Sequence, residues 1–390
     1  MVLRVPRKKG HKYMKKEQEN ACSARLGKVG GGALIEGVMM RAGSDVAVTC
    51  RREDGKLCLI RDTHVSLRKK YKFFNLPLVR GIVNFIESMA LSMKTLNQSA
   101  EIYGGEEEET RAEKWMKKHL GFGLMDVVTF IASILGVLLA VGLFLYLPKL
   151  FTGWIAGLFP AGLPLWAEGV IEGGMKVILF VAYIWLVSLM RDIRRTFMYH
   201  GAEHKSIACY EAGEELTPAN AKKHSRFHPR CGTSFMFVMI LLGIALGIAL
   251  RYILPAEIRE INWLYTVIRL LLLPIVVGFG FEFIMYAGKH QNVLTRIFSA
   301  PGMWMQRLTT REPDEAMLEV AITSLKAALR EEFSDFDTTE YEQNTKLAQE
   351  ENAKKAAEKA ENTEEKPADT THAPAETAEA TDKTDDAAAN

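Results

Sequence analysis

The sequence predicts a mainly α-helical integral membrane protein, and two observations support this fold class. Apolar residues are concentrated in four runs in the middle of the 390-residue chain, whereas charged residues are concentrated toward its two ends. Each run reaches the ~20 mostly apolar residues that a transmembrane helix needs. We expect about four transmembrane helices, at residues 124–147, 170–190, 234–253 and 261–283.

The four runs differ in how strongly they indicate a membrane span. The first and third contain the uncharged stretches "FIASILGVLLAVGLFLYL" and "FMFVMILLGIALGIAL". The second carries Lys176 near one end, and the fourth is interrupted by Arg269 and Pro274. For the fourth run, a buried helix of a soluble domain therefore remains the alternative.

Charge predicts how the spans are oriented. The loop at 191–233 carries eight Lys and Arg residues, whereas the connections on the other side carry very few. Cytoplasmic loops of membrane proteins are enriched in these residues. We expect a protein of the cell membrane with this loop and both termini in the cytoplasm.

The net charge of +2 provides no broad basic field, so nucleic acid is not an expected partner.

The regions outside the spans show separate patterns. The stretches "VAVTCRRE" and "KLCLIR" flank Asp54-Gly55, a strong two-residue turn signal, and predict a β-hairpin. Arg80, Asn84 and Glu87 share one face of a predicted amphipathic helix, which we expect to lie in the membrane interface or to pack on the helix bundle. Residues 351–390 contain no Val, Ile, Leu, Met or aromatic residue, which predicts disorder.

These patterns divide the chain into seven predicted regions. They are a flexible basic arm (1–26), a cytoplasmic module with a β-hairpin (27–76), an interfacial amphipathic helix (77–100), a charged linker (101–121), a four-helix transmembrane region (122–285) that includes the His/Cys-rich cytoplasmic loop 191–233, a cytoplasmic amphipathic helix (286–335) and a disordered tail (336–390).

The stretch "YHGAEHKSIACYE" is a candidate metal site. No proline occurs between residues 170 and 211, so we expect the second span to continue through this stretch as one helix. At about 100° per residue, His200 and His204 lie on one helix face. Their H-x-x-E-H spacing is typical of inverted zincins, in which two imidazoles bind zinc and the carboxylate, here Glu203, is the general base.

A third ligand has to come from elsewhere in the chain, and two sources remain open. Glu282 lies at the end of the fourth span, on the same expected side of the membrane. The stretch "HSRFHPRCG" offers His224, His228 and Cys231. Four of the nine histidines and two of the five cysteines fall within residues 199–231, which favours a metal site over solvated histidines.

Five motifs of this chain resemble those of a known family. They are "GGGALIEGVMMR", "PLVRGIVNFIESM", "YHGAEHKSIACYE", "HPRCGTSF" and "MWMQRLTTREPDEAMLEVAI". Together they resemble the YqhQ-like bacterial membrane proteins, a domain-of-unknown-function family labelled as predicted metal-dependent enzymes. The resemblance implies a multi-span membrane protein with a metal site at His200, Glu203, His204, His228 and Cys231.

Three functions follow as hypotheses. The first is a hydrolase at the cytoplasmic membrane face that acts on a lipid-linked molecule or a membrane peptide. In it His200 and His204 bind zinc together with Glu282, His228 or Cys231. The second is a scaffold with a structural zinc site, because His and Cys donors are typical of such sites. The third is a transporter, based on the charged residues of the fourth span. The oligomeric state stays open.

Overall fold

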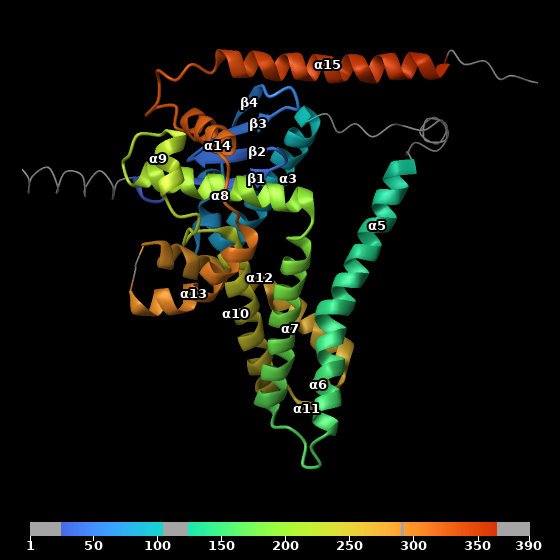
Figure 1. The fold of residues 1–390 in the computed structure, drawn as a ribbon. Helices are drawn as coiled ribbons and strands as arrows, with labels where there is room; N and C mark the ends of the chain where they lie inside the picture. Colours follow the sequence, from blue (N-terminus) through green and yellow to red (C-terminus); the bar gives the residue numbers. More distant parts are fainter. Residues whose placement is uncertain (1–24, 104–123, 290–291, 365–390) are drawn as a thin grey trace, which may run out of the picture.

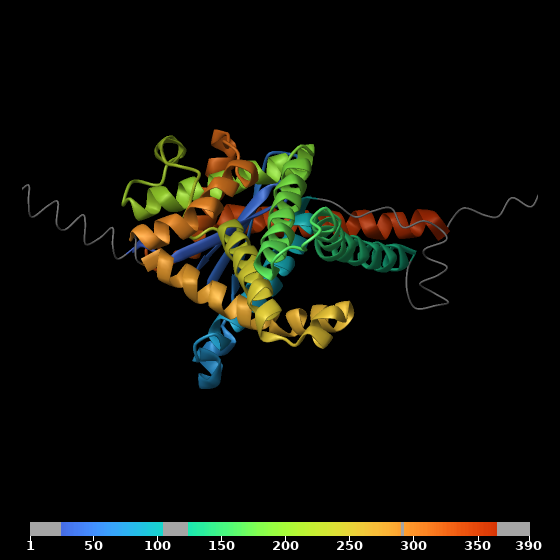
Figure 2. The ribbon, with the colours of Figure 1, turned by 90° about the horizontal axis from the view of Figure 1, so that it is seen from below.

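The computed structural model describes residues 25–103, 124–289 and 292–364. Figure 1 shows a β-sheet surrounded by helices at one end and a group of long helices that extends away from it. Figure 2 gives the view from below, with α7 and α10 in front of the strands. The fold is mainly helical, as predicted, and it contains one small antiparallel sheet where a β-hairpin was expected.

The sheet is a four-stranded meander with the order β1-β2-β3-β4. Its strands are β1 (Val29–Leu34), β2 (Gly37–Ala42), β3 (Asp45–Arg51) and β4 (Leu57–Thr63). The predicted hairpin is confirmed as β3–β4, and Gly55 adopts the positive φ of +84° that its turn requires. Strands β1 and β2 were not predicted. They pair antiparallel across a turn in which Glu36 has a φ of +49°.

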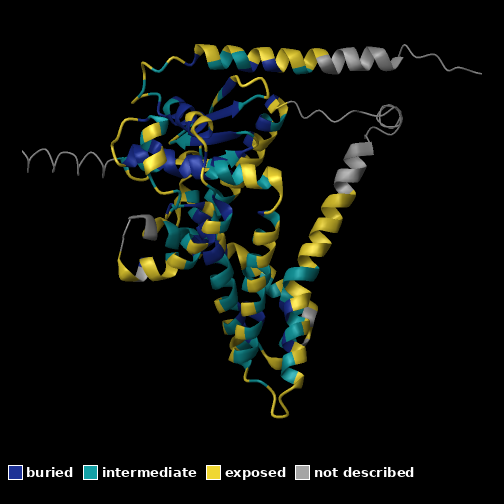
Figure 3. Ribbon diagram, in the orientation of Figure 1, coloured by how far each residue is buried: buried dark blue, intermediate teal, exposed yellow. Residues whose placement is uncertain are grey.

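Helices cover both faces of this sheet. On one face, Val38 and Met40 belong to a core with residues of α8 (Arg191–Glu211) and α14 (Glu315–Ala328). On the other face, Met39 and Val48 contact a core that includes residues of α3 (Val79–Tyr103). Burial of both faces accounts for strands that are apolar without alternation. Figure 3 shows the strands and much of α8 as buried.

Helix α15 (Thr339–Glu364) lies along the edge strand β4, and this corrects the expectation of a disordered tail from residue 336. The Asn344 side-chain amide donates to the Leu57 carbonyl at 3.0 Å, and the Thr345 hydroxyl donates to the Leu59 carbonyl at 2.9 Å. These polar contacts occupy carbonyl groups of an edge strand that would otherwise face solvent. Residues 365–390 of the predicted tail lie outside the described residues.

Four helices are long and apolar enough to cross a membrane, by length and composition. The first is continuous through α5 (Leu124–Val141), the short π-helix η2 (Gly142–Tyr146) and α6 (Leu147–Gly157). The other three are α7 (Leu165–Val187), α10 (Gly232–Ile253) and α12 (Asn262–Lys289). Helix α5 diverges from the others, and its residues 131–141 are exposed (Figure 3).

The expected continuous helix from residue 170 to residue 211 is wrong. Helix α7 ends at Val187, and Met190 adopts an extended conformation with a ψ of 136° before α8 begins. The Ser188 hydroxyl donates to the Trp185 carbonyl at 2.7 Å in the last turn of α7. Figure 1 shows that α8 runs across the end of α7 and beneath the sheet. The chain therefore turns without proline or glycine, and α8 packs on the sheet.

The remaining helices connect these parts. The predicted interfacial helix 77–100 corresponds to α3, which packs on α12 and on the sheet. Two helices, α13 (Val293–Thr309) and α14, occupy the region 286–335, where one was expected. The predicted arm and linker lie mostly outside the described residues. The short helices are α2 (Leu67–Lys70), η1 (Lys72–Asn75), α9 (Pro218–Lys223) and α11 (Ala256–Glu260).

Candidate metal site

The structure brings together three of the predicted ligands at the junction of α8 and α10. The His200 and His204 rings lie on one face of α8, with their centroids 4.4 Å apart. The Cys231 thiol, on the residue just before α10, lies 3.3 Å from His200 Nε2. One potential ligand atom from each of these three residues lies within 4.8 Å of the others. This spacing could hold one metal ion.

Backbone carbonyl groups orient both imidazoles. His200 Nδ1 lies 2.8 Å from the Thr309 carbonyl oxygen, and His204 Nδ1 lies 2.6 Å from the Arg226 carbonyl oxygen. A carbonyl oxygen only accepts, so each Nδ1 carries the proton and each Nε2 keeps its lone pair. Histidines that bind metals are usually held by such a bond from their second ring nitrogen. Both rings are therefore in the tautomer that a metal ligand requires.

Burial favours the ligating state of the second histidine. His204 is 2% exposed, and this burial lowers its pKa, although the Cys231 thiol partly counters the effect. A neutral imidazole binds metals and an imidazolium does not. Cys231 is buried as well, whereas His200 is half-buried. The His204 side of the cluster is therefore shielded from solvent, whereas the His200 side is partly exposed.

Glu203 lies against the first strand of the sheet. A Cβ atom on Gly31 would come within 3.0 Å of Glu203 Cγ and Oε1, so only glycine leaves room for the carboxylate. Burial raises the pKa of Glu203 to about 7, and the neighbouring His200 counters part of this increase. Burial and the neighbouring His200 account for this shift, and no hydrogen bond contributes to it. The carboxylate is available to exchange a proton near neutral pH.

His228 is adjacent to the cluster but faces a carboxylate. Its ring centroid lies 5.5 Å from that of His204, whereas its Nε2 lies 3.6 Å from Glu211. Gln306 holds the backbone of His228 on both sides, because its side chain accepts from the His228 N–H and donates to the His228 carbonyl, each at 2.8 Å. Glu211 also accepts from Arg230. The structure therefore places His228 beside the three ligands, next to an ion pair.

Glu282 is not brought to the cluster, contrary to the expectation that it could be the third ligand. The Arg80 guanidinium donates to both of its carboxylate oxygens. The reason is the position of α3, which packs on α12 and places Arg80 against this part of the fourth apolar helix. Glu282 thus joins two helices, and Cys231 takes the place expected for the third ligand.

A second group, formed by Cys209, Glu214 and His224, also has ligand atoms within 4.8 Å of one another. The Cys209 thiol donates to the Glu215 carbonyl at 3.6 Å, and burial raises its pKa to about 11 with a contribution from Glu214. The thiolate that would bind a metal is therefore disfavoured at this position. The first group is the better candidate.

Sequence reasoning missed the groups that position the ligands. The Thr309 carbonyl, Gln306 and Gly31 belong to segments far from α8 in the chain, whereas the Arg226 carbonyl belongs to the segment between α8 and α10. Because every residue has a main-chain carbonyl, the sequence does not indicate which of them accept these hydrogen bonds. Gln306 and Thr309 do lie in the stretch "MWMQRLTTREPDEAMLEVAI", so the resemblance was the one signal that could have identified them.

The fold and the site define a class: a mainly helical protein with four apolar, membrane-length helices, a small antiparallel sheet and a partly buried His/His/Cys cluster at the junction of α8 and α10. The chain belongs to the family described as "Protein of unknown function (DUF1385)", which matches residues 76–331. The uncharacterized protein YqhQ of Bacillus subtilis (strain 168) is 33% identical over 303 residues, or 77% of this chain and 92% of that protein. No solved structure matches the chain.

Proposed function

We propose that this protein is a membrane-embedded, metal-dependent hydrolase with its metal site at His200, His204 and Cys231. The observation that carries the proposal is the pair of carbonyl contacts that leaves both Nε2 lone pairs available beside the Cys231 thiol. Three protein ligands leave one position of a tetrahedral zinc site open, as in catalytic zinc sites. When bound, zinc would supply Lewis acidity and promote the deprotonation of water.

Glu203 is the proposed general base. Glu203 directly precedes His204 in α8, is 5% exposed, and its carboxylate interacts electrostatically with His200. A pKa of about 7 lets it take a proton from water and return that proton to a leaving group at neutral pH. Gly31 on the facing strand leaves the space that this side chain occupies.

The proposed location is the cytoplasmic face of the cell membrane. The segment 191–233, with α8 and α9, carries eight Lys and Arg residues and lies at the sheet end of the apolar helices. Cys231 directly precedes α10, one of the four apolar helices, so the site lies where the bundle begins. A substrate held at the membrane surface, such as a lipid-linked molecule or a membrane peptide, fits this position.

A structural zinc site is the second candidate, and one observation favours it. His204 and Cys231 are 2% and 5% exposed, and a metal between them would tie α8 to the start of α10. In that case the bound metal would stabilise the fold without any reaction, and Glu203 would have no proton to transfer.

Metal content tests the site itself. Full-length protein purified in detergent is expected to contain about one zinc per chain by elemental analysis. Changing His200→Ala, His204→Ala or Cys231→Ser should remove most of this metal. Glu282→Gln is the matched control, because Glu282 is bound by Arg80 and lies outside the cluster. Unchanged zinc in the first three variants, or loss of zinc in the control, would refute the assignment.

Glu203→Gln separates the two candidate functions. For a hydrolase, this variant keeps its zinc but loses about 100-fold or more of the hydrolysis of ester, amide or phosphoester reporter substrates in nanodiscs. For a structural site, zinc removal lowers the melting temperature, while neither the wild type nor the variant hydrolyses any of the substrates. Equal hydrolysis by wild type and variant would rule out Glu203 as the base.

The orientation is tested by labelling intact cells with a membrane-impermeant maleimide. Ala161 lies in the exposed connection between α6 and α7, on the side expected to face outward. The variant Ala161→Cys should be labelled, and the wild-type chain, whose five cysteines all lie on the expected inner side, should not. Labelling of the wild type without lysis would contradict the proposed orientation.

A further inference from the structure

A cavity of about 640 Å³ lies among the apolar helices, at the end that is remote from the sheet. Its volume falls within the roughly 300–1,000 Å³ that is usual for small-molecule sites. The wall is built from α5, η2, α6, α7, α10, α11 and α12. Most of it is apolar, from Val141, Leu145, Ala156, Leu165, Leu246, Leu270, Leu273 and Val276.

The charged residues of this wall are predominantly cationic. Four cations and two carboxylates line the cavity, and Lys176 adjoins it in a smaller pocket next to Glu172. The six lining residues are Lys149, Arg251, Arg259, Arg269, Glu168 and Glu172. The cations come from α6, α10, α11 and α12, so four separate elements converge to place positive charge around one space.

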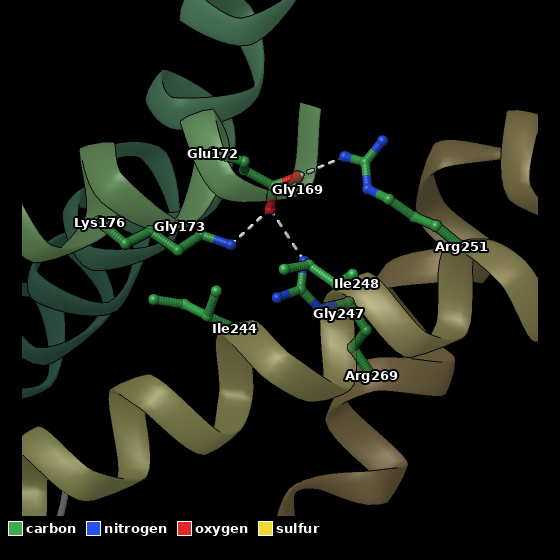
Figure 4. A pocket seen from close by; sticks show the side chains of 9 residues that line it. All are labelled: Gly169, Glu172, Gly173, Lys176, Ile244, Gly247, Ile248, Arg251 and Arg269. Atoms are coloured by element: carbon green, nitrogen blue, oxygen red, sulfur yellow. Dashed lines mark hydrogen bonds and ion pairs between the residues drawn. The ribbon is translucent and has the colours of Figure 1, made fainter. Parts of the chain in front are cut away.

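The carboxylates are already shared among these cations. Figure 4 shows Glu172 at the centre of a network with Lys176, Arg251 and Arg269. The distances from Glu172 to Arg251 and Arg269 are 2.7 and 2.9 Å, and Arg251 also binds Glu168. Uncompensated charge in a low-dielectric region is costly. A bound anion would offset the excess of positive charge.

We infer that this cavity binds the phosphate head group of an anionic membrane lipid, with the lipid chain along the apolar wall. Arginine side chains bind phosphate through two parallel hydrogen bonds, and three arginines line the space. The leucines and valines of α5, η2 and α12 provide a surface for an acyl or isoprenoid chain. This inference rests on the proposed membrane location and is independent of the metal site.

Lys149 on α6 and Arg259 on α11 are the residues to test. They line the cavity from α6 and α11, whereas the three cations that hydrogen-bond to Glu172 come from α7, α10 and α12. The Arg259 guanidinium also donates to the Arg251 carbonyl at 2.6 Å, which places it beside the network. Neutralising both residues should lower the positive charge of the cavity and leave the ion pairs of Glu172 in place.

The test uses the full-length chain in an uncharged detergent, titrated calorimetrically with dihexanoyl phosphatidic acid. Dihexanoyl phosphatidylcholine and inorganic phosphate are titrated in parallel. We expect phosphatidic acid to bind about tenfold or more tightly than either of the others. The double variant Lys149→Gln/Arg259→Gln should lose about tenfold or more of this affinity. The control Arg194→Gln removes an exposed charge on α8 and should bind as the wild type does.

Three results would overturn the inference. Equal affinity for phosphatidic acid and phosphatidylcholine would show that the anionic charge is not recognised. Equal affinity for phosphatidic acid and inorganic phosphate would show that the lipid chain plays no part. Unchanged affinity in the folded double variant would place the lipid elsewhere. If that variant does not fold, the single variant Lys149→Gln replaces it, and the comparison of the three ligands on the wild type is unaffected.

Discussion

Gly201 on α8 lies so close to Arg311 that a Cβ atom built on the glycine would be 2.0 Å from the Arg311 carbonyl oxygen. The Arg311 N–H donates to the Phe197 carbonyl at 2.8 Å, which fixes this segment against α8. Two residues earlier, the Thr309 carbonyl orients the His200 imidazole. The glycine between the two histidine positions therefore allows the close approach through which one of the histidines is oriented.

Gly201→Ala is expected to lower both stability and metal content. The added methyl group overlaps a backbone oxygen that cannot move aside without breaking the contact to Phe197, so the cost should be about 2 kcal/mol or more. Thermal unfolding and elemental analysis measure the two effects. Gly174→Ala on α7 is the control, because nothing lies within 4 Å of its Cβ position. Full zinc occupancy in the Gly201 variant would contradict this prediction.

Gln306→Leu should weaken metal binding although Gln306 is not a ligand. Its fully buried side chain makes hydrogen bonds to the His228 N–H, the His228 carbonyl and the Ser234 hydroxyl. Leucine leaves these groups unpaired, which lowers the free energy of unfolding by about 1–3 kcal/mol. The segment that carries Cys231 is then no longer held in place. We expect about tenfold lower zinc affinity in a chelator competition. Gln349→Leu, on the exposed surface of α15, should change neither the stability of the protein nor its zinc affinity.

Glu203→Gln should stabilise the metal-free protein at high pH. The folded-state pKa of about 7 lies above the ordinary glutamate value of 4.5, so ionisation opposes folding. This cost is absent at low pH, grows as the pH rises from about 4.5 to 7 and is then constant at about 3 kcal/mol. In chelator, the variant should melt at a higher temperature than the wild type at pH 8, and at a similar temperature near pH 4.5. Glu331→Gln, at an exposed position, is the control. A difference that does not depend on pH would argue against a buried, ionising Glu203.

The double variant Asn344→Ala/Thr345→Val should release α15 from the sheet. Both side chains donate to carbonyl groups of β4, and together they account for about 1–3 kcal/mol of local stability. Faster proteolysis at residues 339–350 and faster amide exchange in β4 would show the release. Lys346→Ala, an exposed change on the same helix, should have no such effect. Protection of β4 in the double variant would mean that the remaining contacts of α15, including the ion pairs of Arg61 with Glu342 and of Arg52 with Glu351, are sufficient to hold the helix.

The four apolar helices could be predicted from the sequence because length and hydropathy alone identify them. The proximity of His200 and His204 followed from helical geometry, since α8 includes both. The turn at Ser188–Met190 could not be predicted, because it uses no proline or glycine. It depends on the packing of α8 against a sheet whose first two strands were themselves missed.

Strands β1 and β2 were missed for a physical reason. The segment at 29–42 is rich in glycine, and its apolar residues do not alternate because both faces of the sheet are covered. Glu282 was misplaced because pairing with Arg80 on α3 depends on a tertiary contact between distant helices. Cys231 was one of several possible third ligands, and only the fold distinguishes it from the others.

The coverage of the sheet by α14 has a consequence for how the chain is made. The Ser324 hydroxyl lies within hydrogen-bonding distance of the Val38 and Ala47 carbonyl oxygens, at 3.0 and 2.9 Å. Ser324 follows Val38 by 286 residues in the sequence. A ribosome that adds about 5–20 residues per second needs roughly 15–60 s to cover that distance. All four apolar helices leave the ribosome within this interval. The strands therefore wait with part of one apolar surface uncovered while the four apolar helices are synthesised, and the core between the sheet and α14 can be completed only afterwards.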